Sequence, residues 1–363
     1  MTAGTPAPDF DIKQTIQAVV GGRELSTDEA TAAMDAIMTG QVTGAQIGAL
    51  VTALRMRGET VQEIAGFAAA MRRHALKVEV SPGGGPLVDT CGTGGDASGT
   101  FNVSTTASFA IAAAGVRVAK HGNRAVTSRC GSADLLEGLG VRIELSPGQV
   151  ARCVEEVGIG FMYAPAFHPA MRFVGPARRE IGIRTVFNVL GPLTNPAGAR
   201  HQLVGVGHAG IARTLAEVLA RLGSEHAVLV HAEEGLDELG IAGPSAVTEY
   251  DARAGGIRTY HVTPEEFGLV RGTVADLRGG GPAENVEITR AILAGADGPR
   301  RSITLLNAGA GIYAANAAAS FAAGIALAAE AIDSGRALAR VEELAAFTRR
   351  LAETPAAEAA ATA

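Results

Sequence analysis

The pattern of the sequence changes at Pro86, and this change constrains the fold more than any other feature. Residues 10–75 carry only helix-period apolar spacing, with capping boxes that begin at Ser26, Thr43 and Thr60. Beyond Pro86, short apolar runs alternate with helical segments. Such alternation is typical of a mostly parallel sheet covered by helices. The sequence therefore predicts a small all-helical N-terminal domain hinged to a larger α/β domain.

The domain boundaries are drawn from the same change of pattern. One polar segment with helical spacing, which contains proline and arginine, interrupts the α/β part of the sequence. This segment could return to the helical domain. The Ala/Glu/Thr-rich end of the chain is expected to be disordered. We expect a helical domain over 1–80 with a return segment at 168–185, an α/β domain over 86–167 and 186–352, and a tail at 353–363.

Short apolar runs bounded by turn residues mark the expected strands of the sheet. A capping box with proline at the first helical position marks one of the helices between them. The expected strands are 87–89, 116–120, 141–145, 201–207 and 226–232, and the expected helix is 146–158.

The charge balance excludes one large class of partners. The chain of 363 residues has a net charge of −6, with 28 arginines but only three lysines. A general nucleic-acid-binding protein would carry a positively charged surface, so we expect no nucleic acid partner. Any anionic ligand has to be bound by local groups. With 47 glycines, the chain offers many places where main chain can approach a ligand closely.

Targeting and redox signals favour a cytoplasmic protein. The three cysteines lack CxxC spacing, which argues against a zinc site or a disulfide framework. The N-terminus has neither the basic segment nor the apolar core of a signal peptide. Residues Ile303 to Ala329 carry no charge, but they are mostly Ala, Gly, Asn and Ser. We expect packed helices there and no membrane span.

A glycine-rich block after the first strand is the strongest indication of chemistry. Gly92, Gly94 and Gly95 lead into a helix that opens at residues 102–105. Main chain without side chains can approach an anion closely, and a helix N-terminus adds oriented N–H donors. The block predicts phosphate binding, with Ser104 available to a phosphate or a metal. The alternative is a glycine-rich turn with ordinary capping; no GK[ST] follows, so it is not a P-loop.

The next loop, 120–132, adds a cation to this prediction. The strand before it delivers Lys120, His121, Asn123 and Arg124 at its carboxyl end, where α/β sheets bind ligands. Because nearly all basic residues of the chain are arginines, a lysine at position 120 suggests that a compact point charge is needed there. The alternative is a solvated loop. Ser132, at the end of the loop, could bind phosphate or cap the helix that follows.

An acidic pair and an arginine complete the candidates. Asp237 and Glu238 offer hard oxygen ligands suited to Mg²⁺, although an acidic pair is also common in solvated turns. Arg178 could bind a carboxylate in the two-pronged manner of guanidinium groups. The alternative interpretation of Arg178 is a charged residue on an exposed helix face, which pairs with Glu180 or is solvated. His168 is expected to be structural.

Seven motifs in order resemble the anthranilate phosphoribosyltransferase family, and the resemblance covers nearly the whole chain. It implies the two-domain fold of the nucleoside phosphorylase/phosphoribosyltransferase type and a homodimer through the helical domain. Cys130 stands where the family often has a small hydroxyl residue, and Gly240 where serine is usual. The motifs are CGTGGD (91–96), FNVST (101–105), AKHGNR (119–124), GSADLLEGLG (131–140), FHPAM (167–171), RTVFNVLGPLTNPA (184–197) and GLDEL (235–239).

The resemblance also implies ligands and the residues that hold them. Mg²⁺ would use Ser104, Asp237 and Glu238, and anthranilate would contact Gly92, Asn123 and Arg178. The residues implied in catalysis are Lys120, Asn123 and Arg178. The residues implied for 5-phosphoribosyl 1-diphosphate are Gly92, Gly95, Asp96, Thr100, Asn102, Val103, Ser104, Thr105, Lys120, His121, Gly122, Asn123, Arg124, Ala125, Val126, Thr127, Ser128 and Ser132.

The implied reaction transfers the phosphoribosyl group from the diphosphate to the amine of anthranilate and releases pyrophosphate. Mg²⁺, Lys120 and main-chain N–H groups can stabilise the charge that grows on the leaving group. An aromatic amine is already neutral near pH 7, so strong base activation is not required. The interpretation is electrostatic and orientational catalysis, with the role of His121 as a proton acceptor left open.

Two other enzyme classes compete with this interpretation. Gly205, Gly207 and Gly210 form a GxGxxG after a strand, with Glu233 at a plausible distance for a ribose contact. That pattern is typical of an NAD-dependent oxidoreductase, but it leaves the glycine-rich block at 89–132 without a role. A pyrimidine nucleoside phosphorylase-like enzyme would share the two-domain plan, yet it offers no equivalent of FNVLGPLTNPA.

Overall fold

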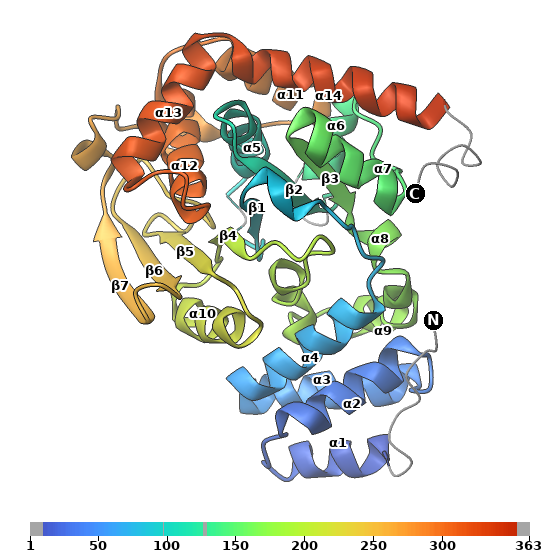
Figure 1. Ribbon diagram of the computed structural model, residues 1–363. Helices are drawn as coiled ribbons and strands as arrows, with labels where there is room; N and C mark the ends of the chain where they lie inside the picture. Colours follow the sequence, from blue (N-terminus) through green and yellow to red (C-terminus); the bar gives the residue numbers. More distant parts are fainter. Residues whose placement is uncertain (1–9, 97, 126–128, 354–363) are drawn as a thin grey trace.

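The computed structural model describes residues 10–96, 98–125 and 129–353. Within them, a bundle of four helices lies beside a larger α/β domain (Figure 1). The capping boxes predicted at Ser26, Thr43 and Thr60 are all formed, each with its partner three residues on. The four helices are α1 (Ile12–Val20), α2 (Thr27–Met38), α3 (Gly44–Arg57) and α4 (Val61–His74).

A seven-stranded sheet forms the centre of the α/β domain, in the order β3-β2-β1-β4-β5-β6-β7. The five strands from β3 to β5 pair in parallel, and β6 and β7 extend the sheet as an antiparallel hairpin. The predicted fold class is therefore confirmed. The strands are β1 (Leu87–Gly92), β2 (Arg117–Gly122), β3 (Ile159–Tyr163), β4 (His201–Gly205), β5 (His226–Ala232), β6 (Ser245–Asp251) and β7 (Gly256–Val262).

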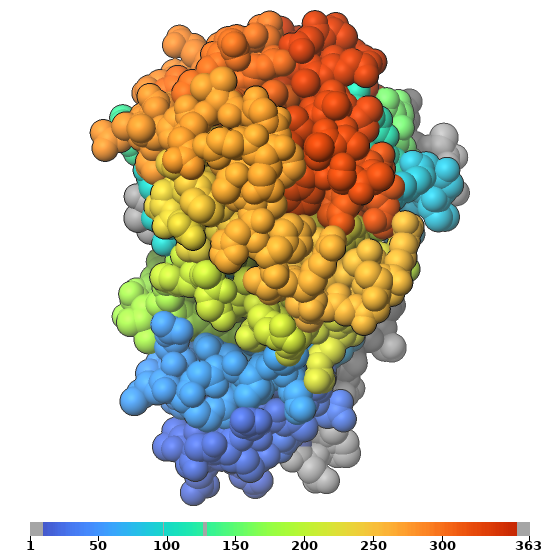
Figure 2. All heavy atoms as spheres, turned by 90° about the vertical axis from the view of Figure 1, so that its left-hand side faces the viewer, coloured from blue at the N-terminus to red at the C-terminus, as the bar shows by residue number. Residues whose placement is uncertain are grey.

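Helices cover both faces of this sheet, and side chains of β4 alternate between two cores. Leu203 points into a core shared with α5 and α12, whereas Val204 points into a core shared with α10 and the helical domain. The bundle, α10 and the C-terminal helices consequently lie in successive layers (Figure 2). The helices of this domain are α5 (Val103–Ala113), α6 (Ser132–Gly138), α7 (Pro147–Arg152), α8 (Ala164–Phe167), α9 (Gly175–Ile181), α10 (Ala212–Arg221), α11 (Pro282–Leu293), α12 (Pro299–Ala314), α13 (Phe321–Asp333) and α14 (Arg336–Glu353).

The uncharged stretch from Ile303 to Ala329 belongs to α12, a short turn and α13, which pack on each other and on α5. Among the residues that the structure describes, no helix is long and apolar enough to cross a membrane. The predicted tail lies outside the described residues except for Glu353, which ends α14.

Helix α9 lies within the segment predicted to return to the helical domain, and it packs against α3. A side chain at Gly48 would meet Ile181 at 3.6 Å, and one at Gly44 would meet Ala177 at 3.9 Å. Val174 and Ala177 belong to the same apolar core as the bundle. These contacts support the predicted return, while the domain boundaries themselves stay predictions.

The strand predicted at 141–145 is wrong. Its apolar residues are buried in alternation, as in a strand, but the segment pairs with no other strand in the described structure. Instead, the N–H of Arg142 donates to the hydroxyl of Thr348 on α14 at 3.0 Å. Three strands were missed, because β3 directly follows a helix and the hairpin strands β6 and β7 carry many polar residues. The helix predicted at 146–158 forms as α7 and a π-helical turn that ends before Gly158.

A buried carboxylate joins the antiparallel hairpin to the rest of the domain. Glu249 on β6 is 1% exposed and accepts hydrogen bonds from four side chains. Burial alone would raise its pKa, but these bonds outweigh burial and lower the pKa to about 2. The donors are His226 on β5, Arg258 and Tyr260 on β7, and Tyr313 on α12.

We predict that Glu249→Gln destabilises the protein in a pH-dependent manner. A glutamate in the unfolded chain titrates near pH ~4.3, so the ionised Glu249 stabilises the fold above that pH. This contribution is lost as pH falls from about 4 toward 2. Thermal unfolding should show a lower Tm for the variant at pH 7 and a much smaller difference near pH 3. A Tm difference that stays constant over this range would contradict the prediction.

Candidate active site

Many of the predicted site residues lie where the parallel strands β1, β2, β4 and β5 end. From β1 the chain proceeds outward through β2 and β3, and from β4 it proceeds outward in the opposite direction to β5. The direction of the connections therefore reverses between β1 and β4. Open α/β sheets bind ligands at the carboxyl ends of the strands beside such a reversal.

The glycine loop, residues 93–96, follows β1 and lies against the loop that carries the acidic pair. Gly94 and Gly95 adopt positive φ angles of 64° and 84°, which residues with side chains rarely adopt. The N–H of Gly94 donates to Oδ2 of Asp237 at 2.9 Å. A side chain at Gly92 would also overlap that carboxylate, within 3.3 Å of its Cγ. The predicted phosphate loop and the predicted metal ligand are thus in direct contact.

Three predicted residues meet at the N-terminus of α5. The N–H of Ser104 donates to Oε1 of Glu238 at 3.1 Å, and the ammonium group of Lys120 donates to the Ser104 hydroxyl at 3.3 Å. The ammonium also donates to the carbonyl of Thr90. Lys120 is 3% exposed, so its charge lies inside the protein, beside a helix N-terminus that itself favours anions.

Carboxylates outnumber cations at this end of the sheet. Burial, followed by the neighbouring Asp96, raises the pKa of Asp237 to about 6. Burial and Asp237 raise the pKa of Glu238 well above its ordinary value. Burial lowers the pKa of Lys120, although Asp89 and Glu238 oppose that change. Each shift disfavours a charge, and a bound divalent cation would reverse the shifts of the two carboxylates.

The donor atoms fit Mg²⁺. Ser104, Asp237 and Glu238 supply hydroxyl and carboxylate oxygens, the hard ligands that this ion prefers. Among the described residues, no three His, Cys, Asp or Glu side chains form a closed metal cage. None is needed, because Mg²⁺ is usually held by one or two carboxylates together with substrate phosphates.

A buried brace that the sequence analysis missed holds Lys120 and His121 in place. Asp89 is fully buried on β1; one of its oxygens accepts from the N–H of His121 at 3.1 Å. The other accepts from the amide of Asn195 at 2.8 Å, and that amide also donates to the carbonyl of Ala119. Asn195 lies in the motif FNVLGPLTNPA, which could have indicated a role for it. The brace fixes the end of β2 relative to β1.

His121 and His168 lie side by side, with ring centres 5.0 Å apart. Burial and the neighbouring His168 lower the pKa of His121 to about 3, and burial and Lys77 lower the pKa of His168 to about 4. Both rings are therefore neutral at pH 7. Nδ1 of His121 lies 3.3 Å from the carbonyl of Gly191, a contact that requires the proton on Nδ1. Nε2 is left as an acceptor, but a pKa of about 3 makes it a weak base.

The loop after β2 is braced by the start of α6. The hydroxyl of Ser132 donates to the carbonyl of Asn123 at 3.1 Å. Ser132 is the first residue of α6 and does not cap it, because the N-cap is Gly131. Arg124 forms ion pairs with Asp134 and Glu137, so its guanidinium is directed to α6.

The remaining residues predicted for the phosphoribosyl donor are placed in several ways. The side chains of Val103 and Thr105 are buried, so only their main chains could face a ligand. The amide of Asn102 donates to the carbonyl of Cys130 at 3.0 Å, and the hydroxyl of Thr100 lies 3.2 Å from that of Ser98. Gly122 packs on the hydroxyl of Ser132, and the N–H of Ala125 donates to Asp134 at 3.0 Å. Val126, Thr127 and Ser128 lie outside the described residues.

Arg178 lies half-buried on α9. Its guanidinium stands over the ring of Phe187, 5.7 Å from the ring centre. Burial lowers its pKa, and within the described chain no carboxylate pairs with it, Glu180 included. A half-buried guanidinium without a counter-ion is suited to a ligand's carboxylate.

The GxGxxG motif has a packing explanation. A side chain at Gly205 would overlap the main chain of Asp237, and one at Gly207 would lie 2.8 Å from the carbonyl of Gly94. Nothing lies within 4 Å of a side chain at Gly210, although the dinucleotide motif needs its third glycine for close packing of helix and strand. The first two glycines thus allow β4 to approach the site loops.

A second arginine that the sequence analysis missed reaches the glycine loop. The guanidinium of Arg184 donates to the carbonyl of Gly94 at 3.1 Å. It also occupies the space that a side chain at Gly95 would need. Arg184 opens the motif RTVFNVLGPLTNPA, but no pattern in the sequence links it to a loop about ninety residues away.

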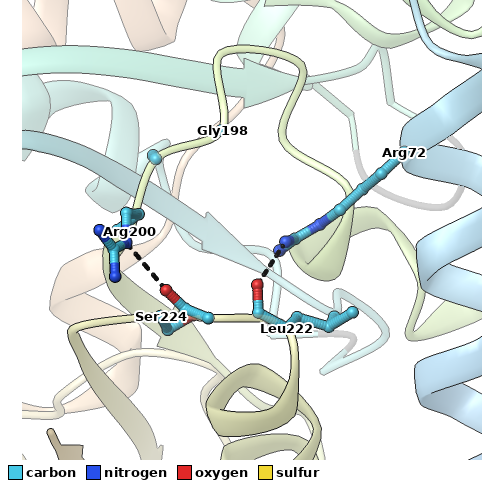
Figure 3. Close-up of a pocket in the computed structure, with 7 residues that line it drawn as sticks. Arg72, Gly198, Arg200, Leu222 and Ser224 are labelled. Carbon is cyan, nitrogen blue, oxygen red and sulfur yellow. Dashed lines mark hydrogen bonds between the residues drawn. The ribbon is translucent and has the colours of Figure 1, made fainter. Parts of the chain in front are cut away.

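Away from the predicted site residues, a cavity of about 360 Å³ lies between the helical domain and the end of α10 (Figure 3). None of the predicted site residues lines it. Arg72 on α4 donates to the carbonyls of Leu193 and Leu222 at 2.7 and 3.0 Å, and so joins the bundle to the α/β domain. Arg200 donates to Gly223 from the other side. The lining residues are Arg72, Gly198, Ala199, Arg200, Leu222, Gly223 and Ser224.

Comparison with known sequences identifies the class of protein in which these two domains are combined. Residues 84–338 match the glycosyl transferase family, a/b domain, and residues 13–75 match the glycosyl transferase family, helical bundle domain. The chain is 56% identical over 342 residues to the anthranilate phosphoribosyltransferase of Chloroflexus aurantiacus, covering 94% of this chain and 99% of the relative. It is 55% identical over 345 residues to that of Thermomicrobium roseum, covering 94% and 98%. The chain belongs to the anthranilate phosphoribosyltransferase family.

Solved structures agree with this assignment. Anthranilate phosphoribosyltransferase from Thermus thermophilus is 46% identical, with a TM-score of 0.86 over 92% of this chain and 99% of that one. The Saccharomyces cerevisiae enzyme in complex with PRPP and Mg is 28% identical, with a TM-score of 0.85 over 93% and 98%. The nucleoside phosphorylase and oxidoreductase alternatives are therefore set aside.

We predict that Gly205→Ala damages the site whereas Gly210→Ala does not. The added methyl group at 205 would meet the main chain of Asp237, which cannot move as a flexible side chain does. Overpacking of this kind costs about 1–3 kcal/mol, so Tm should fall and turnover should drop. At 210 the methyl group enters open space. Equal effects of the two substitutions on Tm and turnover would contradict this explanation of the motif.

Proposed function

We propose that this protein transfers the phosphoribosyl group of 5-phosphoribosyl 1-diphosphate to the amine of anthranilate, a step of tryptophan biosynthesis. The products are N-(5-phosphoribosyl)anthranilate and pyrophosphate. The observation that carries the proposal is the contact of Ser104 with both Lys120 and Glu238 beside the glycine loop. In support, relatives from Saccharomyces cerevisiae have been solved with PRPP and Mg and with 4-fluoroanthranilate.

The donor half of the site would stabilise the leaving group. Negative charge grows on the pyrophosphate as its bond to C1 of the ribose breaks. Lys120 places a buried cation there, and the N-terminus of α5 and the glycine loop add N–H donors. Because these groups are fixed before the reaction, little reorganisation is needed in the transition state. We propose the residues named above, from Gly92 to Ser132, as donor contacts.

Ser104, Asp237 and Glu238 would hold Mg²⁺ at the same place. When bound, the ion supplies positive charge to the diphosphate oxygens. The residues themselves position oxygen ligands beside the glycine loop through the contacts of Asp237 with Gly94 and of Glu238 with Ser104. Their ionisation would be favoured by the ion, opposite to the effect of burial.

The acceptor half would orient anthranilate. Arg178 would offer the carboxylate a guanidinium that pairs with no carboxylate of the described chain, and Gly92 and Asn123 would contact the ring and the amine. The amine needs no strong base, which agrees with the low pKa of His121. Orientation of amine and C1 then supplies much of the rate enhancement.

We also propose a cytoplasmic homodimer formed through the helical domain. Two apolar side chains of the bundle, Val20 and Met56, are 69% and 84% exposed and could be covered by a second copy. No disulfide joins the three cysteines, all of which lie in the described part of the chain. That agrees with a reducing compartment.

The activity can be followed directly by anthranilate fluorescence, because the chain has no tryptophan to give a background. We expect the anthranilate signal to fall only when both 5-phosphoribosyl 1-diphosphate and Mg²⁺ are added. Omission of either compound serves as the control. A constant signal with folded protein and both additions would refute the proposed function.

Arg178→Ala should raise the KM for anthranilate about tenfold or more, because a charged hydrogen bond to the carboxylate is lost. The KM for 5-phosphoribosyl 1-diphosphate should stay nearly unchanged. Arg179→Ala is the matched control, since Arg179 is the next residue on α9 and is exposed. An effect of Arg178→Ala on the diphosphate KM alone would show that the acceptor is placed wrongly.

A further inference from the structure

The glycine loop is held from two sides. On one side, the N–H of Gly94 donates to Asp237, and the N–H of Gly207 donates to the hydroxyl of Thr93 at 3.0 Å. On the other side, the guanidinium of Arg184 donates to the carbonyl of Gly94 at 3.1 Å. Both the N–H and the carbonyl of Gly94 therefore form hydrogen bonds.

Such restraint matters because this loop has little stiffness of its own. Two successive glycines with positive φ lose more conformational freedom on ordering than residues with side chains. A ligand that had to order the loop would bind more weakly by that cost. A contact that orders the loop beforehand therefore increases the affinity for a ligand of its N–H groups.

Arg184 is suited to this task by its own surroundings. It is half-buried, and no carboxylate in the described chain forms an ion pair with it. Among the described residues its charge is thus not neutralised by a carboxylate, and it faces a loop that is proposed to bind an anion. A guanidinium also has several N–H donors, so one can hold Gly94 while others remain available.

The main chain around Arg184 is anchored at a distance from the loop. Gly182, with φ of 68°, ends α9, and the N–H of Thr185 donates to the side chain of Asn188 at 2.9 Å. Helix α9 packs against α3 of the helical domain. Arg184 therefore links the glycine loop to a segment that the bundle holds in place.

We propose that Arg184 is a positioning residue for the phosphoribosyl donor: it fixes the glycine loop in the conformation that binds the diphosphate. The inference rests on the proposed function, because it takes this loop to be the donor-binding loop. It adds a residue outside the motifs that implied the donor contacts.

The direct test measures binding of 5-phosphoribosyl 1-diphosphate with Mg²⁺ by calorimetry, without anthranilate. Arg184→Ala should raise the Kd roughly tenfold, as expected for loss of a charged hydrogen bond, and Arg184→Lys should restore part of the affinity. Arg179→Ala, which removes an exposed guanidinium from the same segment, should leave the Kd unchanged. Amide exchange of the peptide that contains Gly92–Asp96 should become faster in Arg184→Ala but not in Arg179→Ala.

A double-mutant cycle separates this role from a general loss of structure. An added methyl group at Gly95 would displace the guanidinium of Arg184, so Gly95→Ala should raise the Kd in the native background. With Arg184→Ala present, the same substitution has no guanidinium to displace and should raise the Kd by a smaller factor. Equal factors in the two backgrounds would overturn the proposal.

Other outcomes are equally decisive. A Kd for Arg184→Ala within twofold of the native value, or an unchanged exchange rate of the loop, would overturn the positioning role. If the native protein binds the diphosphate but does not consume anthranilate, the proposed acceptor fails while the result for Arg184 stands. If the native protein binds no diphosphate, both proposals fail.

Discussion

The close approach of main chains at the carboxyl ends of β1 and β4 is the constraint on which the site depends. Gly205 ends β4 directly against the main chain of Asp237, and Gly207 lies under the carbonyl of Gly94. Side chains at these two positions would push the glycine loop and the acidic loop apart. Their absence brings the glycine loop and the acidic pair to one point, although they are far apart in the sequence.

That arrangement concentrates charge at a partly buried end of the sheet. Asp237 and Glu238 lie half-buried side by side, and partial burial of like charges is unfavourable unless cations offset it. Lys120 offsets part of the charge and is itself steadied by Asp89. The chain as a whole is acidic, so it does not gather phosphates by a basic surface. A local balance of acids, one buried lysine and a helix N-terminus is the arrangement on which the proposed binding of Mg²⁺ and a diphosphate rests.

The sequence offers candidate site residues most readily where they lie in one continuous stretch. The glycine loop follows β1, Lys120 lies near the end of β2 and Ser104 lies at the start of α5, so the order of elements in the sequence already indicates one edge of the sheet. Asp89 and Arg184 could not be predicted in this way, because their roles arise from contacts with Asn195 and Gly94 that only the folded chain creates. The segment 141–145 has the alternation of a strand because one side of it is buried, and burial does not require pairing with a neighbour. The GxGxxG motif was ambiguous for a related reason: glycines serve any close approach of main chains, whatever lies on the other side.

The helical domain acquires a physical role through a short segment. Helix α9 rests on α3 and carries Arg178, and Gly182 separates it from Arg184 at the glycine loop. Arg178 faces the proposed acceptor and Arg184 the proposed donor, so one anchored segment supports both halves of the site. Arg72 holds the end of α10 to the bundle from another side. Because these contacts bridge the two domains, a change in the relative position of the domains would be expected to alter both proposed substrate sites together. The bundle, which contributes none of the predicted ligand contacts, is in this way connected to both proposed halves of the site.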